Sequence, residues 1–292
     1  MSPKYSICIS NYNMSSTLEE SLNSILCQLT EKFEVIVVDD GSSDNSLEIL
    51  YKMQEKYSIL KVIPLLRDNR RKLGETRNVS VRAATGKYVL LHLDTDDVWD
   101  TYIVSFTKIY HDLEKRLNIE NFMLSGKQIQ MATKKLLLIN PYSNIYYVED
   151  RILWNNLAVK NRLISIDHKE IRSRIPIKGK KLKIIKAFKS QFSSMAAAYA
   201  YSPNAFRTTK NYLVRIKETF KNSFVFSIIT MFLLLPSLLK GRFISRKPFE
   251  NQLNGNPRKI FKINLNDLEK KYMNDYGELN LNNDERDIFI NF

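Results

Sequence analysis

The sequence has little of the residues that mark several classes of protein. Only 8 Gly and 8 Pro occur among 292 residues, which excludes a low-complexity or collagen-like chain. The two cysteines, Cys8 and Cys27, have no metal-type spacing, and their apolar surroundings predict buried, reduced thiols. The first ten residues lack the apolar run of a signal peptide. These absences favour a globular protein in the cytoplasm.

Acidic residues are also under-represented, at 31 Asp and Glu against 45 Lys and Arg, which leaves a net charge of +14. A basic excess of this size predicts a polyanionic partner, such as nucleic acid, an acidic membrane face or a phosphorylated ligand. The excess is concentrated in residues 168–190, where Glu170 is the single acid.

Apolar strand patterns alternate with amphipathic helix patterns through the first hundred residues. Buried strands are expected at 5–10, 33–40, 59–65 and 87–93, with helices at 15–29, 43–57 and 74–85 between them. A helix at 101–117, a strand or hairpin at 121–131 and a helix from 148 follow. This order predicts an α/β fold with a mostly parallel sheet flanked by helices.

Polar side chains follow three of the predicted strands directly. Ligands of parallel sheets bind beyond the carboxyl ends of the strands, so these residues are expected to meet in one crevice. They are Asn11, Tyr12 and Asn13 after the first strand, Asp39, Asp40 and Gly41 after the second, and Asp94, Asp96 and Asp97 after the fourth.

The three aspartates after the fourth strand lie within four residues and would repel one another if unpaired. A hard divalent cation such as Mg²⁺ or Mn²⁺ removes this repulsion, because it takes oxygen ligands and shares the oxygens of a diphosphate. The alternative is that Asp96 or Asp97 caps the following helix and is stabilised by its dipole. Three acids are more than a cap needs, which favours the metal.

The other two strand ends also allow two interpretations. Asp-Gly followed by Ser-Ser-Asp at 40–44 is a turn and a helix cap, yet the same carboxylate could accept a hydrogen bond from a nucleobase. The Asn-Tyr-Asn at 11–13 is either a plain turn or a loop that stacks Tyr12 on the base.

Five motifs together resemble the family 2 inverting glycosyltransferases of the GT-A fold. They are "ISNYN", "VVDDGSSD", "GETRNVSVRAATGKY", "LDTDD" and "EDRILW", and they occur in the family's order across residues 5–154. The resemblance implies a GT-A domain, which we place at residues 1–200. The loss of strand–helix alternation after about residue 200 and the uncharged run at 223–239 predict a helical, membrane-associated appendage at residues 201–292. The resemblance also implies a metal-dependent transfer of sugar from a nucleotide-diphosphate donor, preferably a UDP-sugar, to an acceptor hydroxyl.

The resemblance assigns roles position by position. Asn11, Tyr12 and Asp40 would hold the nucleobase, and Arg77 would approach the phosphates or ribose of the donor. Asp96 would contact the ribose, while Asp97, together with Asp94, would ligate Mg²⁺ or Mn²⁺. Asp150 would be the catalytic base, ahead of its neighbour Glu149; the alternative for Asp150 is a first-turn acid that stabilises a helix dipole.

Residues 223–239 carry no charge and would extend over about 25 Å as a helix. Basic residues flank both ends, so the run gives no clear orientation, and an in-plane or re-entrant anchor fits as well as a span. The alternative is a buried helix of the appendage. With an anchor, the Lys-rich segment would meet acidic headgroups at the cytoplasmic membrane face, and the acceptor would be a saccharide or lipid-linked saccharide.

Two other functions remain open from the sequence. One is transfer to a polyprenyl phosphate instead of a sugar hydroxyl. The other is an inactive transferase-like module that binds polyanions or lipid. The intact acids at 94, 96, 97 and 150 argue against the inactive module, and no nucleic-acid partner is expected.

Overall fold

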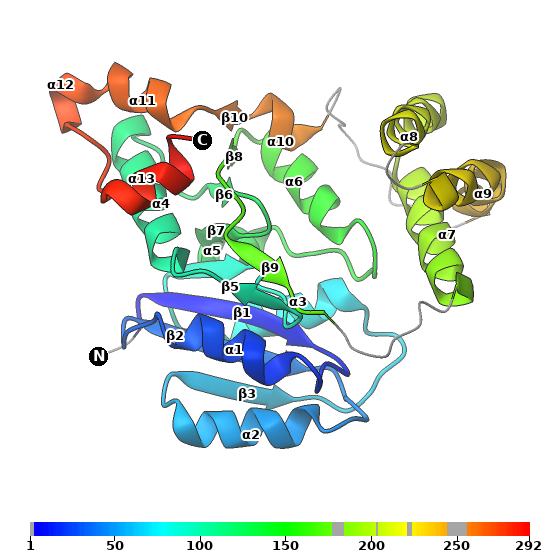
Figure 1. The fold of residues 1–292 in the computed structure, drawn as a ribbon, viewed down its shortest axis with the longest axis horizontal. Coiled ribbons are helices and arrows are strands. Elements are labelled where there is room, and N and C mark those ends of the chain that lie inside the picture. The colour runs from blue at the N-terminus through cyan, green and yellow to red at the C-terminus, as the bar shows by residue number, and fades with distance from the viewer. Residues whose placement is uncertain (1–2, 177–183, 203, 221–223, 244–255) are drawn as a thin grey trace.

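The computed structural model describes residues 3–176, 184–202, 204–220, 224–243 and 256–292. Figure 1 shows a central sheet with helices on both faces and a group of helices to one side. The predicted α/β architecture, with a mostly parallel sheet flanked by helices and helices at the C-terminal end, is confirmed.

The first half of the chain alternates strands and helices as the sequence predicts. Because both faces of the sheet are covered, its central strands are rich in apolar residues, and every residue of β2 is buried. Strand β2 pairs in parallel with β1 and with β3, and β1 also pairs in parallel with β4. The elements are β1 (Tyr5–Asn11), α1 (Leu18–Leu26), β2 (Phe33–Asp39), α2 (Ser46–Lys56), β3 (Leu60–Pro64), α3 (Leu73–Ala83) and β4 (Tyr88–Leu91).

The sheet then grows outward from β4 through the predicted hairpin. Its described strands follow the order β10-β8-β6-β7-β4-β1-β2-β3, and within it β7 runs antiparallel to β4 and β6. Strands β5 and β9 form a separate antiparallel pair. The elements are β5 (Asp97–Trp99), α4 (Ile103–Leu117), β6 (Met123–Ser125), β7 (Gln130–Thr133), α5 (Lys134–Ile139), α6 (Glu149–Val159), β8 (Leu163–Ile166) and β9 (Arg172–Arg174).

The end of the chain returns to this sheet. Strand β10 pairs with β8, and Glu285 accepts hydrogen bonds from Ser105 Oγ at 2.6 Å and Lys108 Nζ at 2.7 Å on α4. Phe289 is buried in the main core. The elements are α10 (Pro257–Ile260), β10 (Lys262–Ile263), α11 (Leu265–Lys271), α12 (Met273–Tyr276) and α13 (Asn283–Phe289). We refer to residues 3–176 and 256–292 as the sheet domain; a domain boundary at residue 200 stays a prediction.

Three further helices pack on one another: α7 (Ile184–Tyr201), α8 (Ala205–Thr219) and α9 (Phe224–Phe243). They have a small core of their own, built from Met195, Tyr199, Tyr212 and Leu233. We call α7, α8 and α9 the helical unit, which lies at the right of Figure 1.

The two thiols differ in their surroundings. Cys8 is buried in β1, as the sequence predicts. The prediction for Cys27 was wrong, because this residue is the exposed C-cap of α1 and lies just past the apolar face of the helix.

Candidate functional site

The ends of β1 and β2 are joined by side-chain hydrogen bonds. Asn11 is almost fully buried and donates from Nδ2 to Asp39 Oδ2 at 2.8 Å. The other oxygen of Asp39 accepts from the backbone N–H of Ser42 at 2.8 Å, which holds the Asp-Gly turn. Part of the predicted base-binding loop is therefore used to shape the crevice, and the Asn11 amide supports Asp39.

Two arginines lie beside Asp40, which follows the end of β2. Both carboxylate oxygens of Asp40 are engaged, by Arg67 Nη1 at 2.5 Å and Arg71 Nε at 2.6 Å. The Arg67 guanidinium also stacks 4.3 Å from the ring centroid of Tyr12, which is 44% exposed. Neither arginine was predicted from the sequence, although the basic run after β3 was a signal for them.

The loop from β4 to β5 carries the three aspartates, and α1 holds the loop in place. Ser21 Oγ donates to the backbone oxygen of Asp94 at 3.2 Å, and Thr17 Oγ1 donates to that of Thr95 at 2.9 Å. His92 adopts a positive φ of 67° where the chain leaves the strand. These contacts to α1 and its N-cap use the backbone oxygens of the loop and not its carboxylates.

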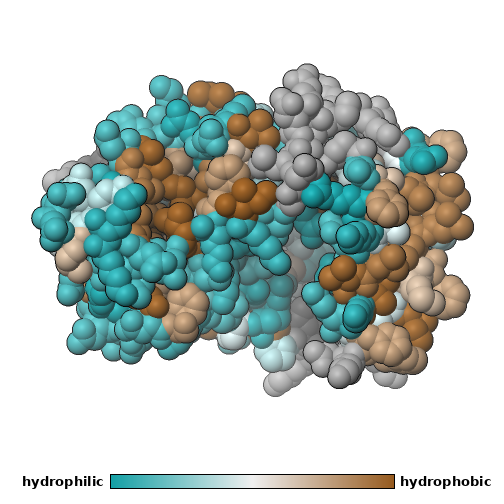
Figure 2. Space-filling view, turned by 90° about the horizontal axis from the view of Figure 1, so that it is seen from above, coloured by the Kyte–Doolittle hydropathy of each residue, from teal (hydrophilic) through white to brown (hydrophobic). Residues whose placement is uncertain are grey.

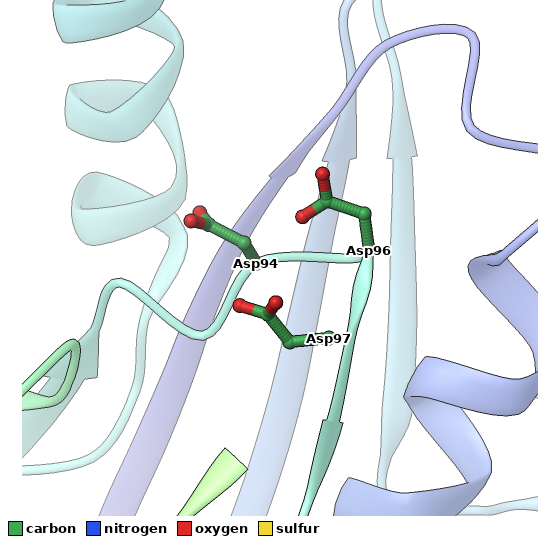
Figure 3. Close-up of side chains that lie close together, drawn as sticks. All are labelled: Asp94, Asp96 and Asp97. Atoms are coloured by element: carbon green, nitrogen blue, oxygen red, sulfur yellow. The ribbon is translucent and has the colours of Figure 1, made fainter. Parts of the chain in front are cut away.

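The three carboxylates converge. One oxygen each from Asp94, Asp96 and Asp97 lies within 4.8 Å of the others, and Figure 3 shows the three side chains on the β4–β5 loop and at the start of β5. Burial raises the pKa of Asp94 and of Asp97, and the neighbouring carboxylates raise both further. A cation near the three side chains would oppose this rise.

Two arginines of β9 supply positive charge at this point. Asp97 pairs across the β5–β9 ladder with Arg174, and its carboxylate lies 2.6 Å from Arg172 Nη1 and 3.3 Å from Arg174 Nε. Arg174 also forms an ion pair with Asp96. Part of the basic segment at 168–190 therefore faces the acidic cluster, a pairing that sequence separation had hidden.

Arg77 of α3 lies in a buried polar network. Its Nη1 is 2.8 Å from Glu149 Oε1 and 3.1 Å from His92 Nε2, and His92 in turn contacts the Tyr142 hydroxyl at 3.2 Å. Burial alone would lower the pKa of Arg77, but the surrounding groups together raise it. Those groups are Tyr142, Glu149, Asp94 and Asp150. Arg77 thus links the acidic loop to the start of α6.

The two acids that open α6 differ in environment. Glu149 is buried, and its burial raises its pKa to about 7, against the lowering effect of Arg77. Asp150 is partly exposed, and its Oδ1 accepts only the backbone N–H of Arg151 among the contacts described, at 2.7 Å. Of the pair, Asp150 is the more exposed, and Glu149 is held by Arg77.

A residue from the far end of the chain also reaches this region. Arg258 of α10 donates to the backbone oxygen of Gly126 at 2.6 Å and stacks 5.1 Å from the ring of Trp154. Burial lowers the pKa of Arg258, while Asp150 opposes that shift. Nothing in the local sequence around Arg258 indicates this placement, which depends on β10 joining the sheet.

Fold and site together define a GT-A glycosyltransferase domain, with a mostly parallel sheet and an acidic loop at its carboxyl edge. Residues 6–119 match the family model described as glycosyl transferase family 2. This N-terminal part of the chain is therefore a family 2 glycosyltransferase domain.

Curated relatives and solved structures are consistent with that assignment. An uncharacterized glycosyltransferase of Nostoc sp. is 41% identical over 33% of this chain and 29% of its own length. A poly-beta-1,6-N-acetyl-D-glucosamine synthase of Staphylococcus aureus is 38% identical over 30% of this chain and 21% of its own. The chain thus matches less than a third of either relative.

Among solved structures, a mannosyltransferase from Pyrobaculum calidifontis, in complex with GDP-Man and Mn²⁺, has a TM-score of 0.52. It is 15% identical, and the match covers 84% of this chain and 77% of that one. At this level of identity the likeness concerns the fold.

Proposed function

We propose that the protein is a metal-dependent inverting glycosyltransferase that moves a sugar from a nucleotide-diphosphate donor to an acceptor hydroxyl. The observation that carries the proposal is the convergence of Asp94, Asp96 and Asp97, within 4.8 Å of one another, at the carboxyl edge of a GT-A sheet. The relatives named above support it, since one is a synthase of an N-acetylglucosamine polymer and the mannosyltransferase binds GDP-Man with Mn²⁺.

The acidic cluster fits a hard divalent cation. All three side chains offer carboxylate oxygen, which Mg²⁺ and Mn²⁺ prefer. Burial and the neighbouring carboxylates raise the pKa of Asp94 and of Asp97, a cost that a bound cation would relieve. We assign Asp97 and Asp94 as ligands and place Asp96 beside the ribose. A bound cation would neutralise the diphosphate and make it a better leaving group.

The remaining residues would bind the donor and activate the acceptor. Tyr12, next to Arg67, would face the nucleobase, with Asp40 and Asn11 shaping the base pocket; a UDP-sugar is the donor we expect first. Asp150 would accept the proton of the acceptor hydroxyl as that oxygen attacks the anomeric carbon, which gives a single displacement and inversion. Arg77 would keep α6 in register with the acidic loop through Glu149.

We place the acceptor, a saccharide or lipid-linked saccharide, at the cytoplasmic membrane face. The supporting observation is α9, a 20-residue helix that is long and apolar enough to cross a membrane, with a mean hydropathy of 1.9 over its apolar window.

The proposal is tested by incubating the purified protein with UDP- and GDP-sugars, Mn²⁺ and a panel of saccharide and lipid-linked acceptors, including a polyprenyl phosphate. We expect transfer that requires Mn²⁺ and is lost in Asp97→Asn and Asp150→Asn. Asp275→Asn, an exposed acid on α12, is the matched control and should retain full rate. Transfer that persists at full rate in both site variants would overturn the mechanism.

A further inference from the structure

Large apolar side chains cover the outward face of α9. Phe232 is 70% exposed and Leu235 is 64% exposed, values expected for polar residues on a helix in water. The exposed members of this face are Phe224, Val225, Met231, Phe232, Leu235, Leu239 and Phe243.

The inward face of the same helix is mostly small and polar, with Leu233 as the one large apolar residue among its buried positions. Ser227, Thr230, Ser237 and Gly241 are buried, and their spacing of three, seven and four residues aligns them along one side of the helix. Two of their hydroxyls are hydrogen-bonded within the helical unit: Ser227 Oγ contacts Thr219 Oγ1 at 3.0 Å, and Thr230 Oγ1 donates to a backbone oxygen of α9 at 2.7 Å.

The small residues let α9 approach α7 closely. A Cβ added at Gly241 would lie 2.7 Å from Tyr199 Cβ and 2.9 Å from the backbone oxygen of Ala196, so no larger residue fits without a shift. Ala196 and Ala200 of α7 are themselves buried. Close packing through small residues, with large apolar side chains outward, is how helices associate in lipid, where the hydrophobic effect does not drive them together.

Helix α8 continues the apolar surface and adds charge beside it. Phe206 is 80% exposed, and the exposed Leu213 and Val214 lie close in sequence to the exposed Lys210 and Arg215. Figure 2 shows hydrophobic side chains gathered on the outer side of the helical unit, at the right of the view. Apolar residues with neighbouring basic residues are typical of surfaces that lie at a lipid interface.

The net positive charge of the helical unit favours an anionic bilayer over a second copy of this chain as its partner. Residues 184–243 contain nine Lys and Arg and one acid, Glu218. A second copy of the helical unit would bring the same positive charge to the contact and be repelled. An anionic bilayer carries the complementary charge and also accepts the apolar side chains.

We propose that the outer face of α8 and α9 lies in the plane of an anionic lipid bilayer, with the α9 side chains immersed and the basic residues among the headgroups. A perpendicular α9 would carry the charged α8 that packs beside it into the hydrocarbon, whereas an in-plane α9 leaves those charges at the interface. The inference deepens the proposed function by giving its membrane face a contact surface, and it holds or fails independently of sugar transfer.

Vesicle flotation tests the surface directly. The full chain, purified in detergent and exchanged into buffer, is mixed with phosphatidylcholine vesicles with and without phosphatidylglycerol at about one anionic lipid in three. We expect flotation with the anionic vesicles, reduced about tenfold or more in the double variant Phe232→Ser/Leu235→Ser. The matched control is Leu66→Ser/Ile139→Ser, which removes two exposed apolar residues of the sheet domain and should float like the wild type.

Flotation that is unchanged by Phe232→Ser/Leu235→Ser would overturn the proposal, because the attachment would then lie elsewhere. So would a protein that stays in solution with both vesicle types. A dimer in lipid-free buffer that dissociates in the same variant, without flotation of the wild type, would assign the face to a contact between copies.

Depth measurements separate the in-plane arrangement from a span. Phe224→Trp, Phe232→Trp and Leu239→Trp are prepared singly, and the introduced indole is quenched by lipids brominated at shallow and deep positions of the acyl chain. The in-plane arrangement predicts similar, shallow depths for the three positions. An indole at position 232 that lies much deeper than those at the other two positions would show a span and contradict the proposal.

Discussion

The sheet domain and the helical unit use opposite packing arrangements. In the sheet domain, large apolar side chains such as Ile7 and Leu90 are fully buried, and the polar groups lie at the strand ends. In α9 the buried residues are small or polar except for Leu233, and the exposed large apolar residues lie on the outward face. One chain therefore contains a region that buries its large apolar side chains and a region that exposes many of them.

This difference predicts which region should carry the chemistry and which should bind the membrane. The polar edge of the sheet domain concentrates carboxylates and arginines, which suits charged ligands and proton transfer. The outer face of the helical unit has no such cluster among its described residues, and its apolar surface suits lipid. Variants in the two regions should therefore affect chemistry and membrane binding separately.

The largest expected effect comes from the sheet domain. Asp150→Asn should lower kcat about 10²–10⁴-fold, because the acceptor hydroxyl loses its general base. Nucleotide binding and vesicle flotation should stay within about twofold of wild type. Stopped assays with a radiolabelled donor measure the rate, and a variant that keeps wild-type kcat would remove Asp150 from the mechanism.

Replacing a leucine with alanine should reduce the free energy of unfolding more in the sheet domain than in the helical unit. Leu90→Ala in β4 should reduce the free energy of unfolding by about 2–5 kcal/mol, since it leaves a cavity in a packed core. Leu235→Ala on the outer face of α9 should change it by less than about 0.5 kcal/mol in detergent. Chemical denaturation measures the free energy of unfolding of both variants. Equal decreases would contradict the conclusion that the leucine of α9 is exposed and that of β4 is packed in a core.

A further prediction concerns enlarging a small residue on the inward face of α9. Gly241→Leu should lower the melting temperature, because even its Cβ would meet Tyr199 and the backbone of α7. Gly277→Leu is the comparison variant. No atom lies within 4 Å of a Cβ added at Gly277, but φ is positive there, so this variant reports the cost of backbone strain without a steric clash. A Gly241 variant as stable as wild type would show that α7 and α9 are not closely packed.

The buried network of the sheet domain should give a pH-dependent stability. Because burial raises the pKa of Glu149 to about 7, the folded protein binds a proton there that the unfolded chain releases near pH 4.5. Its contribution therefore falls as pH rises from about 4.5 through 7. Relative to Glu149→Gln, wild type should lose about 1–3 kcal/mol between about pH 5 and 8 in urea titrations. Parallel curves for the two proteins would refute a buried, titrating Glu149.

The smallest expected effect concerns the arginines beside the acidic cluster. Arg174 is 56% exposed, and it pairs with Asp97, which we assign to a cation, and with Asp96, which we place beside the ribose. Arg174→Gln should strengthen Mn²⁺ binding about two- to fivefold, since a competing positive charge is removed from an exposed pair. Lys270→Gln, on α11, is the control. Weaker Mn²⁺ binding in Arg174→Gln would mean that the arginine supports the site instead of competing for it.

Much of the sheet domain could be predicted from the sequence, because its signals are local. Continuous apolar strands and intervening helix patterns predicted the parallel sheet, and the strand ends located the residues that the structure brings to one edge. The hairpin of β6 and β7 and the acids in the first turn of α6 were likewise evident from short segments.

The contacts that the sequence analysis missed join residues far apart in the chain. Arg174 meets Asp97 only because β9 pairs with β5, and Arg258 reaches Gly126 only because β10 joins β8. The apolar run of α9 was evident, but its division into a small inward face and a large outward face depends on the packing of α7. Local periodicity carries no information about such partners.

The central claim is that the acidic loop binds a divalent cation together with a nucleotide diphosphate. Calorimetric titration of UDP and GDP with and without Mn²⁺ tests it most directly, in wild type and in Asp94→Asn and Asp97→Asn variants whose melting temperatures are checked. The account predicts that Mn²⁺ strengthens binding of one nucleotide at least about tenfold, and that either substitution abolishes this gain. Nucleotide binding that is equal with and without Mn²⁺, or absent under both conditions, would contradict it.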